Sequence, residues 1–188
     1  MAFNFFRTFS SHSLLAGLAT LAVLAVAIPH DSYAQAPKGA SGLPLPRFVS
    51  LKSRKVNLRV GPSKDYAVSW LFLKPGLPVE IIQEFDNWRR VRDADGAEGW
   101  VFHSLLSGSR TAIAAPWMRD KEKDESVFVK LHSAAAETGS IVAKLEPGVV
   151  LTLDECNGDW CKAEVDGAEG CVNQAEIWGA YPGEAFTK

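Results

Sequence analysis

The sequence predicts an all-β protein in which two small barrels follow one another, preceded by a signal peptide and a short flexible leader. Three features carry this prediction. An apolar run lies close to the N-terminus, the rest of the chain contains an internal repeat, and apolar residues alternate with polar ones within each copy of that repeat.

Residues 1–34 have the order of a secretory signal peptide. A polar stretch without acidic residues precedes the apolar run Leu14–Ile28, and the small residues Ser32 and Ala34 occupy the −3 and −1 positions of a cleavage site. The run is shorter than the roughly 20 apolar residues of a spanning helix, and no cysteine lies near the cleavage site to carry a lipid. We therefore expect cleavage between Ala34 and Gln35, secretion across the inner membrane, a mature protein without a membrane span, and a periplasmic or extracellular location.

An internal repeat organises the rest of the chain. The matched segments are, in order, Val56–Arg59 with Val129–His132, Leu73–Gly76 with Leu145–Gly148, Trp88 with Trp160, and Asp95–Val101 with Asp166–Val172. The last pair is identical at six of seven positions, and the offset changes only from 73 to 71 residues. The repeat predicts a first domain over 48–114 and a second over 115–184. Residues 35–47, rich in Pro, Gly and Ala, are predicted to form a flexible leader.

Within each unit the apolar residues have the period of strands. Val56 and Leu58 alternate with Asn57 and Arg59, as expected for a strand that is buried on one face. The Asp-Gly pairs in the two copies predict tight type I′ hairpin turns. Several short strands at this spacing, without a convincing helical stripe, predict a small barrel for each unit.

The motifs of the first unit resemble those of the bacterial SH3 domain family. They are VNLRVGPS over Val56–Ser63, Pro75-Gly76, Trp88-x-x-Val91 and Gly99-Trp100-Val101. The second unit resembles the same family in divergent form, since alanines replace the Gly-Pro-Ser loop and Cys171 stands in the place of Trp100. The resemblance implies two five-stranded SH3-like barrels. It also implies an exported binding protein whose partner is peptidoglycan or a peptide or protein of the cell envelope, with no cofactor.

All three cysteines lie in the second unit. Cys156 and Cys161 flank a short loop between two expected strands, so their side chains face one another as a cross-strand pair. In an oxidising compartment this pair is expected to form a disulfide. Cys171 is then a free thiol, for which burial, a reactive or redox role and an intermolecular bridge stay open. The three cysteines lack the paired spacing of a structural zinc site, and no metal is expected.

Catalysis finds little support in the residues. In the mature chain, His103 and His132 lie at non-equivalent positions of the two units, and no stretch is left over for a peptidase domain. The acidic residues around Asp95 are typical of a solvated hairpin. We therefore predict that the protein is not an enzyme.

The aromatic residues of the first unit are the candidates for ligand recognition. Successive side chains of a strand point to opposite faces. If Val91 points inward, Arg90 and Trp88 therefore both point outward, which predicts a half-exposed indole beside a guanidinium group. Together with Tyr66 and Trp100, these two residues form the expected binding set. The alternative is that most of the rings fill a very small core.

Charge differs between the two halves of the mature chain. Residues 47–114 contain 11 Lys and Arg against 7 Asp and Glu, whereas residues 115–188 contain 7 against 14. The basic half suits anionic wall polymers, and no basic run indicates nucleic acid. The leading hypothesis is an envelope binding module. The alternative is a structural adaptor in which both units pack as one assembly; the oligomeric state stays open.

Overall fold

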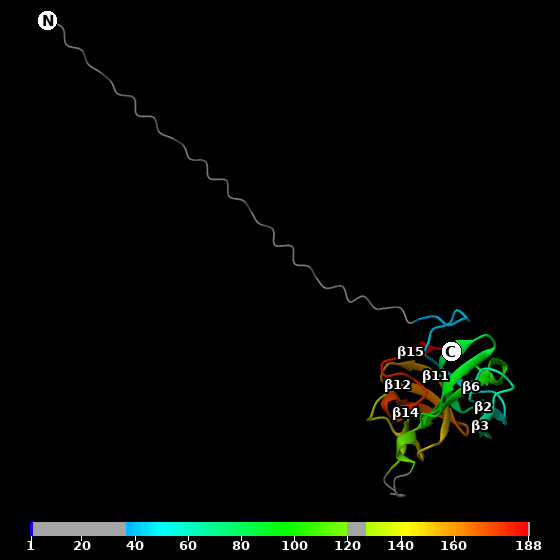
Figure 1. The fold of residues 1–188 in the computed structure, drawn as a ribbon. Helices are drawn as coiled ribbons and strands as arrows, with labels where there is room; N and C mark the ends of the chain where they lie inside the picture. Colours follow the sequence, from blue (N-terminus) through cyan, green and yellow to red (C-terminus); the bar gives the residue numbers. More distant parts are fainter. Residues whose placement is uncertain (2–36, 120–126, 188) are drawn as a thin grey trace. The chain divides into compact units, whose positions relative to one another are not determined.

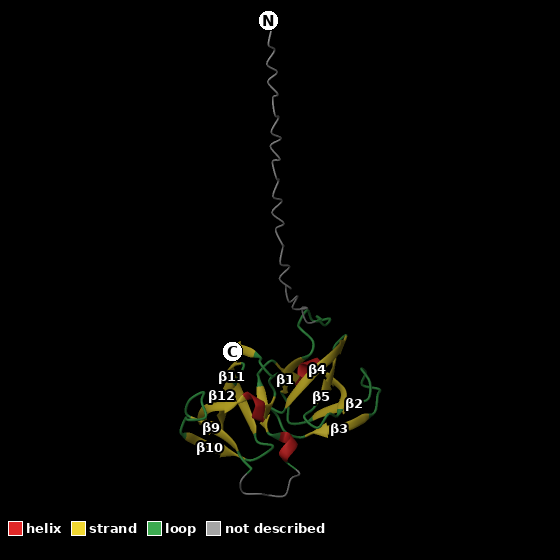
Figure 2. Cartoon of the chain, turned by 90° about the vertical axis from the view of Figure 1, so that its left-hand side faces the viewer, coloured by secondary structure: helices red, strands yellow, loops and turns green. Residues whose placement is uncertain are grey.

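A computed structural model describes Met1, residues 37–119 and residues 127–187, so the expected cleavage site at Ala34 and Gln35 lies outside the described residues. The all-β fold class is confirmed (Figures 1 and 2). The helical elements of the described part are short 3-10 turns: η1 (His103–Leu105), η2 (Pro116–Met118) and η3 (Gln174–Glu176). None of the helices in these ranges has the length and apolar character that crossing a membrane requires.

Two antiparallel sheets follow one another along the chain (Figure 2). The strands of the first sheet are β1 (Arg47–Leu51), β2 (Val56–Arg59), β3 (Val68–Phe72), β4 (Pro78–Phe85), β5 (Trp88–Arg92), β6 (Glu98–Phe102) and β7 (Leu106–Ser107). Those of the second are β8 (Thr111–Ala114), β9 (Val129–His132), β10 (Ile141–Leu145), β11 (Val150–Asn157), β12 (Trp160–Val165), β13 (Ala168–Asn173), β14 (Ile177–Trp178) and β15 (Ala185–Thr187).

The strand order is the same in both sheets. It runs β3-β2-β6-β5-β4-β1-β7 in the first and β10-β9-β13-β12-β11-β8-β14 in the second, with β15 added beside β11. Each sheet therefore holds more strands than the five expected, because a leading strand and a short strand after the 3-10 turn join the repeat. The leading strand β8 also brings the start of the second sheet to Thr111, ahead of the expected boundary at 115.

Each sheet encloses its own apolar core, built from the inward residues of alternating strands. In β2, Val56 and Leu58 are buried whereas Asn57 is exposed, which confirms the predicted alternation. The first core consists of Val49, Leu51, Val56, Leu58, Phe72, Val79, Ile81, Val91 and Val101. The second core includes the half-cystines Cys156 and Cys161.

The two Asp-Gly hairpins differ. Asp166 and Gly167 both have positive φ, 48° and 81°, as the predicted type I′ turn requires. In the first sheet the loop is longer, and the carboxylate of Asp93 accepts hydrogen bonds from the backbone N–H groups of Asp95 (3.0 Å) and Ala97 (2.8 Å). Only Gly96 has positive φ there, so the type I′ prediction for this loop is wrong.

The leader is anchored rather than flexible over its described part, which corrects the prediction for 35–47. The buried carboxylate of Glu84 accepts hydrogen bonds from the backbone and hydroxyl of Ser41 (2.7 and 2.8 Å) and from Arg47 (2.6 Å). Arg89 lies 3.2 Å from the same carboxylate. Burial alone would raise the pKa of Glu84, but the hydrogen bonds from Ser41 and Arg47 outweigh it and lower the pKa to about 2.

Replacing Glu84 tests this anchor. Glu84→Gln keeps the shape but removes the charge, and we expect a loss of about 2 kcal/mol of unfolding free energy at pH 7. Because the folded pKa lies below the unfolded one, the carboxylate's contribution is present above about pH 4.5 and fades as the pH falls toward 2. Urea unfolding should therefore show a smaller difference in unfolding free energy between wild type and variant at pH 2.5 than at pH 7. A gap of equal size at both values would contradict the role of the charge; Glu146→Gln, at an exposed position, is the control.

The two sheets pack on one another through aromatic rings and a buried carboxylate. Phe48 lies against Trp178 (ring centroids 5.0 Å apart) and Tyr181 (4.7 Å). The Tyr181 hydroxyl donates to Glu80 (2.8 Å), which is 4% exposed and also accepts two hydrogen bonds from Arg92 (2.6 and 2.9 Å). Burial and the neighbouring Glu80 raise the pKa of Tyr181 above its usual value, so the hydroxyl remains a donor. Residues 35–188 accordingly form one compact unit.

Arg110 closes this interface on the C-terminal side. Its guanidinium group donates to both carboxylate oxygens of Glu184 (2.8 and 2.9 Å) and lies over the ring of Phe186, 4.1 Å from the centroid. These contacts fix the segment between β14 and β15, which carries Tyr181, to the start of the second sheet. The same guanidinium group lies 5.9 Å from the ring centroid of Phe48 in β1.

Tyr181→Phe should destabilise both sheets together. The substitution leaves one lone pair of the buried Glu80 without its donor while Arg92 stays in place, so we expect a loss of about 1–2 kcal/mol. Urea unfolding followed by circular dichroism should give one transition shifted to lower urea. Tyr66→Phe, which removes a hydroxyl from a half-exposed ring, should leave the midpoint unchanged. Equal midpoints for the two variants, or two separate transitions in the wild type, would show that the sheets do not stabilise one another.

Candidate functional site

The centre of the candidate site is a row of three side chains across neighbouring strands. The register pairs Trp100 of β6 with Arg59 of β2 on one side and with Arg90 of β5 on the other. Directly opposite residues of antiparallel strands project from the same face of a sheet. Because the adjacent Val91 and Val101 are buried in the core, this face is the outer one. We call Arg59, Trp100 and Arg90 the Trp100 row.

Two further aromatic rings border the row. The guanidinium group of Arg59 donates to the backbone carbonyl of Tyr66 (2.6 Å), which places Tyr66 beside the row. The Tyr66 ring packs so closely on Gly61 that a Cβ there would lie 2.6 Å from ring atoms. Phe85 approaches Trp100 edge-on, with centroids 6.5 Å apart. The indole is thus flanked by a cation on each side and by rings on the neighbouring chain segments.

The row carries positive charge that the protein itself only partly neutralises. Arg90 forms a salt bridge with Glu98 (2.8 Å). Arg59 has no carboxylate within salt-bridge distance in the described part of the chain. A guanidinium group presents a planar fork of donors that fits a carboxylate, and an indole offers an apolar face for stacking. The row is therefore suited to a ligand that combines a carboxylate with an apolar or ring surface.

The structure brings together three of the four residues expected at the site: Tyr66, Arg90 and Trp100. Trp88 is different, because it is only 9% exposed. It shares the outer face of Arg90, as its parity predicted, but it pairs with Phe102 and packs edge-to-face on that ring (5.4 Å). The expectation of a half-exposed Trp88 is thus wrong. Arg59 was not among the expected residues, although its outward parity beside Leu58 is visible in the sequence.

The second sheet repeats the row with other side chains. His132, Cys171 and Lys162 are opposite one another on β9, β13 and β12. His132 is only 3% exposed, its Nδ1 donates to the carbonyl of Gly139 (3.0 Å), and Trp160 covers its ring edge-on (5.5 Å). This row presents neither a central indole nor a free guanidinium group, so it does not reproduce the chemistry of the Trp100 row.

The predicted disulfide between Cys156 and Cys161 is confirmed. The two residues are directly opposite on β11 and β12, with Cα atoms 4.1 Å apart. Cys171 is free and half-buried. Among the residues that the structure describes, no three His, Cys, Asp or Glu side chains are grouped to hold a metal ion.

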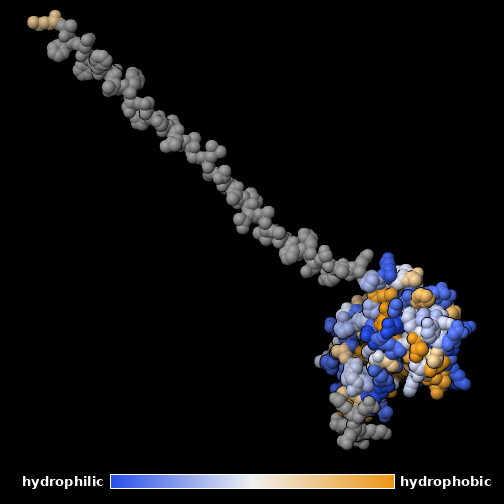
Figure 3. Space-filling view, viewed as in Figure 1, coloured by the Kyte–Doolittle hydropathy of each residue, from blue (hydrophilic) through white to orange (hydrophobic). Residues whose placement is uncertain are grey.

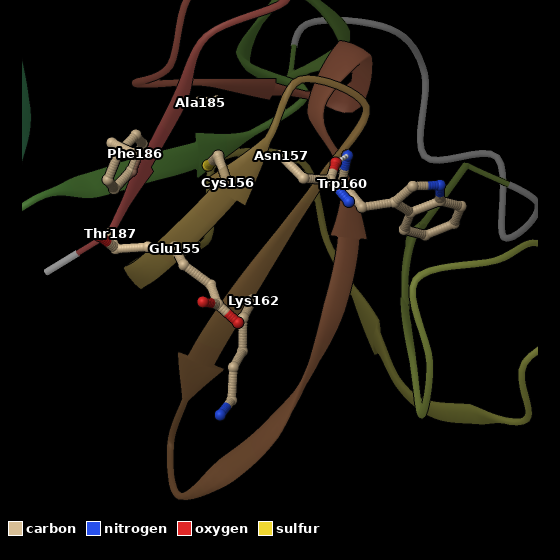
Figure 4. Close-up of a pocket in the computed structure, with 8 residues that line it drawn as sticks. All are labelled: Glu155, Cys156, Asn157, Trp160, Lys162, Ala185, Phe186 and Thr187. Carbon is tan, nitrogen blue, oxygen red and sulfur yellow. Dashed lines mark hydrogen bonds between the residues drawn. The ribbon is translucent and has the colours of Figure 1, made fainter.

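A hollow of about 570 Å³ lies beside this disulfide. Its lining consists of Glu155, Cys156, Asn157, Trp160, Lys162, Ala185, Phe186 and Thr187. Figure 4 shows Phe186 and Trp160 on opposite sides of the hairpin and Glu155 and Lys162 extending to the same side. The hollow places one acid and one base together and lacks the unpaired guanidinium group of the Trp100 row, which makes it the weaker candidate.

Comparison with known proteins identifies the repeated unit. A family model described as "Bacterial SH3 domain" matches residues 52–108 and 125–179. No curated protein matches the chain. Two similar solved structures are NlpC2 and NlpC1 from Trichomonas vaginalis, at 11% and 13% identity and a TM-score of 0.31 each. The matches cover 71% and 74% of this chain but 48% of each of those chains, so this chain spans about half of their length.

The state of Cys171 can be measured directly. We expect the unreduced, folded protein to react with a thiol reagent slowly and at one site per chain, because Cys171 is half-buried and the other two cysteines are joined. Unfolding without a reductant should raise the rate but not the number of sites. Mass spectrometry should locate the label, and Cys171→Ser should abolish it. Three reactive thiols, or a covalent dimer that disappears in Cys171→Ser, would contradict this assignment.

Proposed function

Because the chain belongs to the bacterial SH3 domain family in both of its repeats, we propose that it is an exported envelope protein that binds peptidoglycan through the Trp100 row. Bacterial SH3 domains often bind peptidoglycan. In this proposal the protein binds the polymer without catalysing a reaction on it, and the outer face of the first sheet makes the contact.

The observation that carries the proposal is an unpaired guanidinium group directly beside a partly exposed indole. Arg59 and Trp100 are opposite one another, and Arg59 has no carboxylate partner in the described residues. The stem peptides of peptidoglycan carry carboxylates, and its sugar rings have apolar faces. A carboxylate on Arg59 and a ring or methyl group on Trp100 would satisfy both side chains at once.

Export is part of the same proposal. The pattern of residues 1–34 supports it, and so does the disulfide between Cys156 and Cys161, because such bonds persist in oxidising compartments. A periplasmic location would place the Trp100 row in contact with the wall polymer.

The proposal assigns binding to the first sheet and support to the second. The first half of the mature chain has an excess of basic residues, which suits an anionic polymer, whereas the second half has an excess of acidic ones. The buried His132 and the half-buried Cys171 occupy the places of Arg59 and Trp100 in the second sheet.

Binding to purified sacculi tests the proposal. We expect Trp100→Ala and Arg59→Ala each to lower the bound fraction at least about fivefold, as hot-spot truncations do. Binding of the wild type should weaken as ionic strength rises, because a charge contact is screened by salt. The measurement is co-sedimentation of the mature protein with sacculi, with soluble muropeptides as competitors.

Trp117→Ala is the matched control. It removes an exposed indole from η2, which lines a different hollow together with Phe128 and Ala175, and should leave retention unchanged. Equal loss in Trp117→Ala and Trp100→Ala would point to nonspecific adhesion. Absence of retention in the wild type would exclude the wall as the ligand.

A second candidate is a structural adaptor that binds a third protein with both sheets as one assembly. The packing of Phe48 and Glu80 against Tyr181 favours it, because the mature chain forms one compact unit. A loss of partner binding in Tyr181→Phe would distinguish this adaptor from a wall-binding protein, because the substitution leaves the Trp100 row unchanged.

A further inference from the structure

Two connections at one end of the first sheet lie side by side, and all of their charged side chains are positive. One joins β1 to β2 and the other joins β3 to β4. The N–H of Gly76 donates to the carbonyl of Leu51 (2.7 Å) on one side of the pair, and Val56 is opposite Phe72 on the other. The exposed cations of the two connections are Lys52, Arg54, Lys55 and Lys74.

The protein itself does not neutralise these four cations. None of their side chains has a hydrogen bond or a salt bridge in the described part of the chain. The neighbouring η1, whose Leu105 accepts a hydrogen bond from the N–H of Lys52 (2.8 Å), also lacks an acid. Asp86 lies beyond η1 on the turn after β4, and Asp65 precedes the far end of β3. Residues 47–79 contain seven Lys and Arg and a single acid, so the region attracts an anionic partner.

An exposed leucine lies among the cations. Leu73 directly precedes Lys74 and is 64% exposed. Leu71, two residues earlier, is also exposed and is opposite the exposed Asn57, which places it on the outer face of β3. Figure 3 shows apolar side chains over the region of β2 and β3 with hydrophilic ones around them. The surface is therefore both basic and apolar.

The second sheet shows that the fold does not require this leucine. A buried residue ends the outermost strand of each sheet, Phe72 in β3 and Leu145 in β10. Before the Pro-Gly turn that follows, the first sheet has Leu73 and Lys74, whereas the second has Glu146 alone. The same turn is thus closed without an exposed apolar residue, and with an acid in place of a cation.

We propose that this surface binds an anionic phospholipid bilayer. The cations contact the phosphate headgroups, and the leucines enter the boundary between headgroups and acyl chains. A soluble polyanion would pair with the cations but leave the leucines in water, whereas a bilayer has an anionic layer directly above an apolar one. We call the surface the basic loop patch; it consists of Lys52, Arg54, Lys55, Leu71, Leu73 and Lys74.

The basic loop patch and the Trp100 row occupy different parts of the same sheet. Lys55 directly precedes β2 and Arg59 ends it, so the two residues are roughly 13 Å apart along the strand. The proposal goes beyond peptidoglycan binding and does not rest on it. Purified sacculi lack the bilayer and vesicles lack peptidoglycan, so either proposal can fail without the other.

Co-sedimentation with vesicles tests the patch, using the protein from Gln35 onward that forms the compact unit. The probes are vesicles of phosphatidylcholine mixed with phosphatidylglycerol and vesicles of phosphatidylcholine alone. We expect the partition coefficient to be at least about tenfold higher for the anionic vesicles. It should fall as ionic strength rises, because salt screens the contact.

Paired substitutions of equal charge locate the contact. Lys55→Gln with Lys74→Gln should lower the partition coefficient at least about tenfold. The matched control is Lys130→Gln with Lys144→Gln, which removes two exposed lysines from the second sheet. It should leave the coefficient within about twofold of the wild-type value.

A third substitution separates a bilayer from a soluble polyanion. Leu73→Ser should lower the partition coefficient at least about fivefold, because an apolar side chain no longer leaves water. It should leave binding to soluble polyphosphate unchanged. Ile141→Ser, at an exposed apolar position of β10, is the control and should not alter vesicle binding. Circular dichroism checks that these exposed substitutions leave the fold intact.

Several results would overturn the proposal. They are no binding of the wild type to anionic vesicles, equal binding to both kinds of vesicle, and equal losses in the two lysine pairs. Vesicle binding that depends on the lysines but not on Leu73 would assign the patch to a soluble polyanion instead. A loss in Trp100→Ala as large as that in Leu73→Ser would move the lipid contact to the Trp100 row.

Discussion

The close approach of β6 to β2 at Gly99 is the constraint on which the candidate site depends. A Cβ at this position would lie 2.6 Å from the side chain of Leu58 and 2.9 Å from the carbonyl oxygen of Arg59, distances that real Cβ atoms do not adopt. Only a glycine lets the two strands come together here, and their contact places Arg59 opposite Trp100. Gly170 meets the same constraint in the second sheet, where a Cβ would lie 2.6 Å from the carbonyl oxygen of His132.

This constraint separates what the two sheets share from what they do not. The glycine fixes the backbone, so the positions of the row are the same in both copies, whereas the side chains at those positions face outward and are free to differ. In the first sheet they are an indole between two guanidinium groups. In the second they are a thiol between an imidazole and an amine, with Trp160 packed on His132. The fold is thus repeated while the chemistry of its outer face is not.

Sequence patterns predicted the features that depend on residues close together in the chain. The alternation in β2, the Asp166-Gly167 turn and the disulfide between Cys156 and Cys161 all follow from period-two geometry or from a short loop. Contacts between distant segments were not predictable in this way. Ser41 reaches Glu84 across 43 residues, and Tyr181 reaches Glu80 across 101, with no local signal for either.

The errors at the candidate site have the same origin. Parity placed Trp88 on the outer face, but whether an outward ring is exposed depends on what covers it, and Phe102 comes from another strand. Arg59 shared the outward parity of Arg90, yet its value as a ligand group depends on its having no acidic partner, which only the folded arrangement shows. The hydrophobic period of a strand therefore predicts which face a side chain is on. Whether that side chain is exposed, and whether its charge has a partner, depends on the residues that pack around it in the folded protein.

The outer face of β5 carries both a contact with the second sheet and one residue of the candidate binding row. Arg92 turns to Glu80, which receives the Tyr181 hydroxyl from the second sheet, and Arg90 stands two residues away in the Trp100 row. Because residues two apart on a strand share a face, the contact between the sheets and the candidate binding row are neighbours on one surface. The contact occupies the Arg92 end and leaves Arg59 and Trp100 free. Packing of the two sheets and ligand binding by the first are therefore compatible, and the second sheet can position the row without covering it.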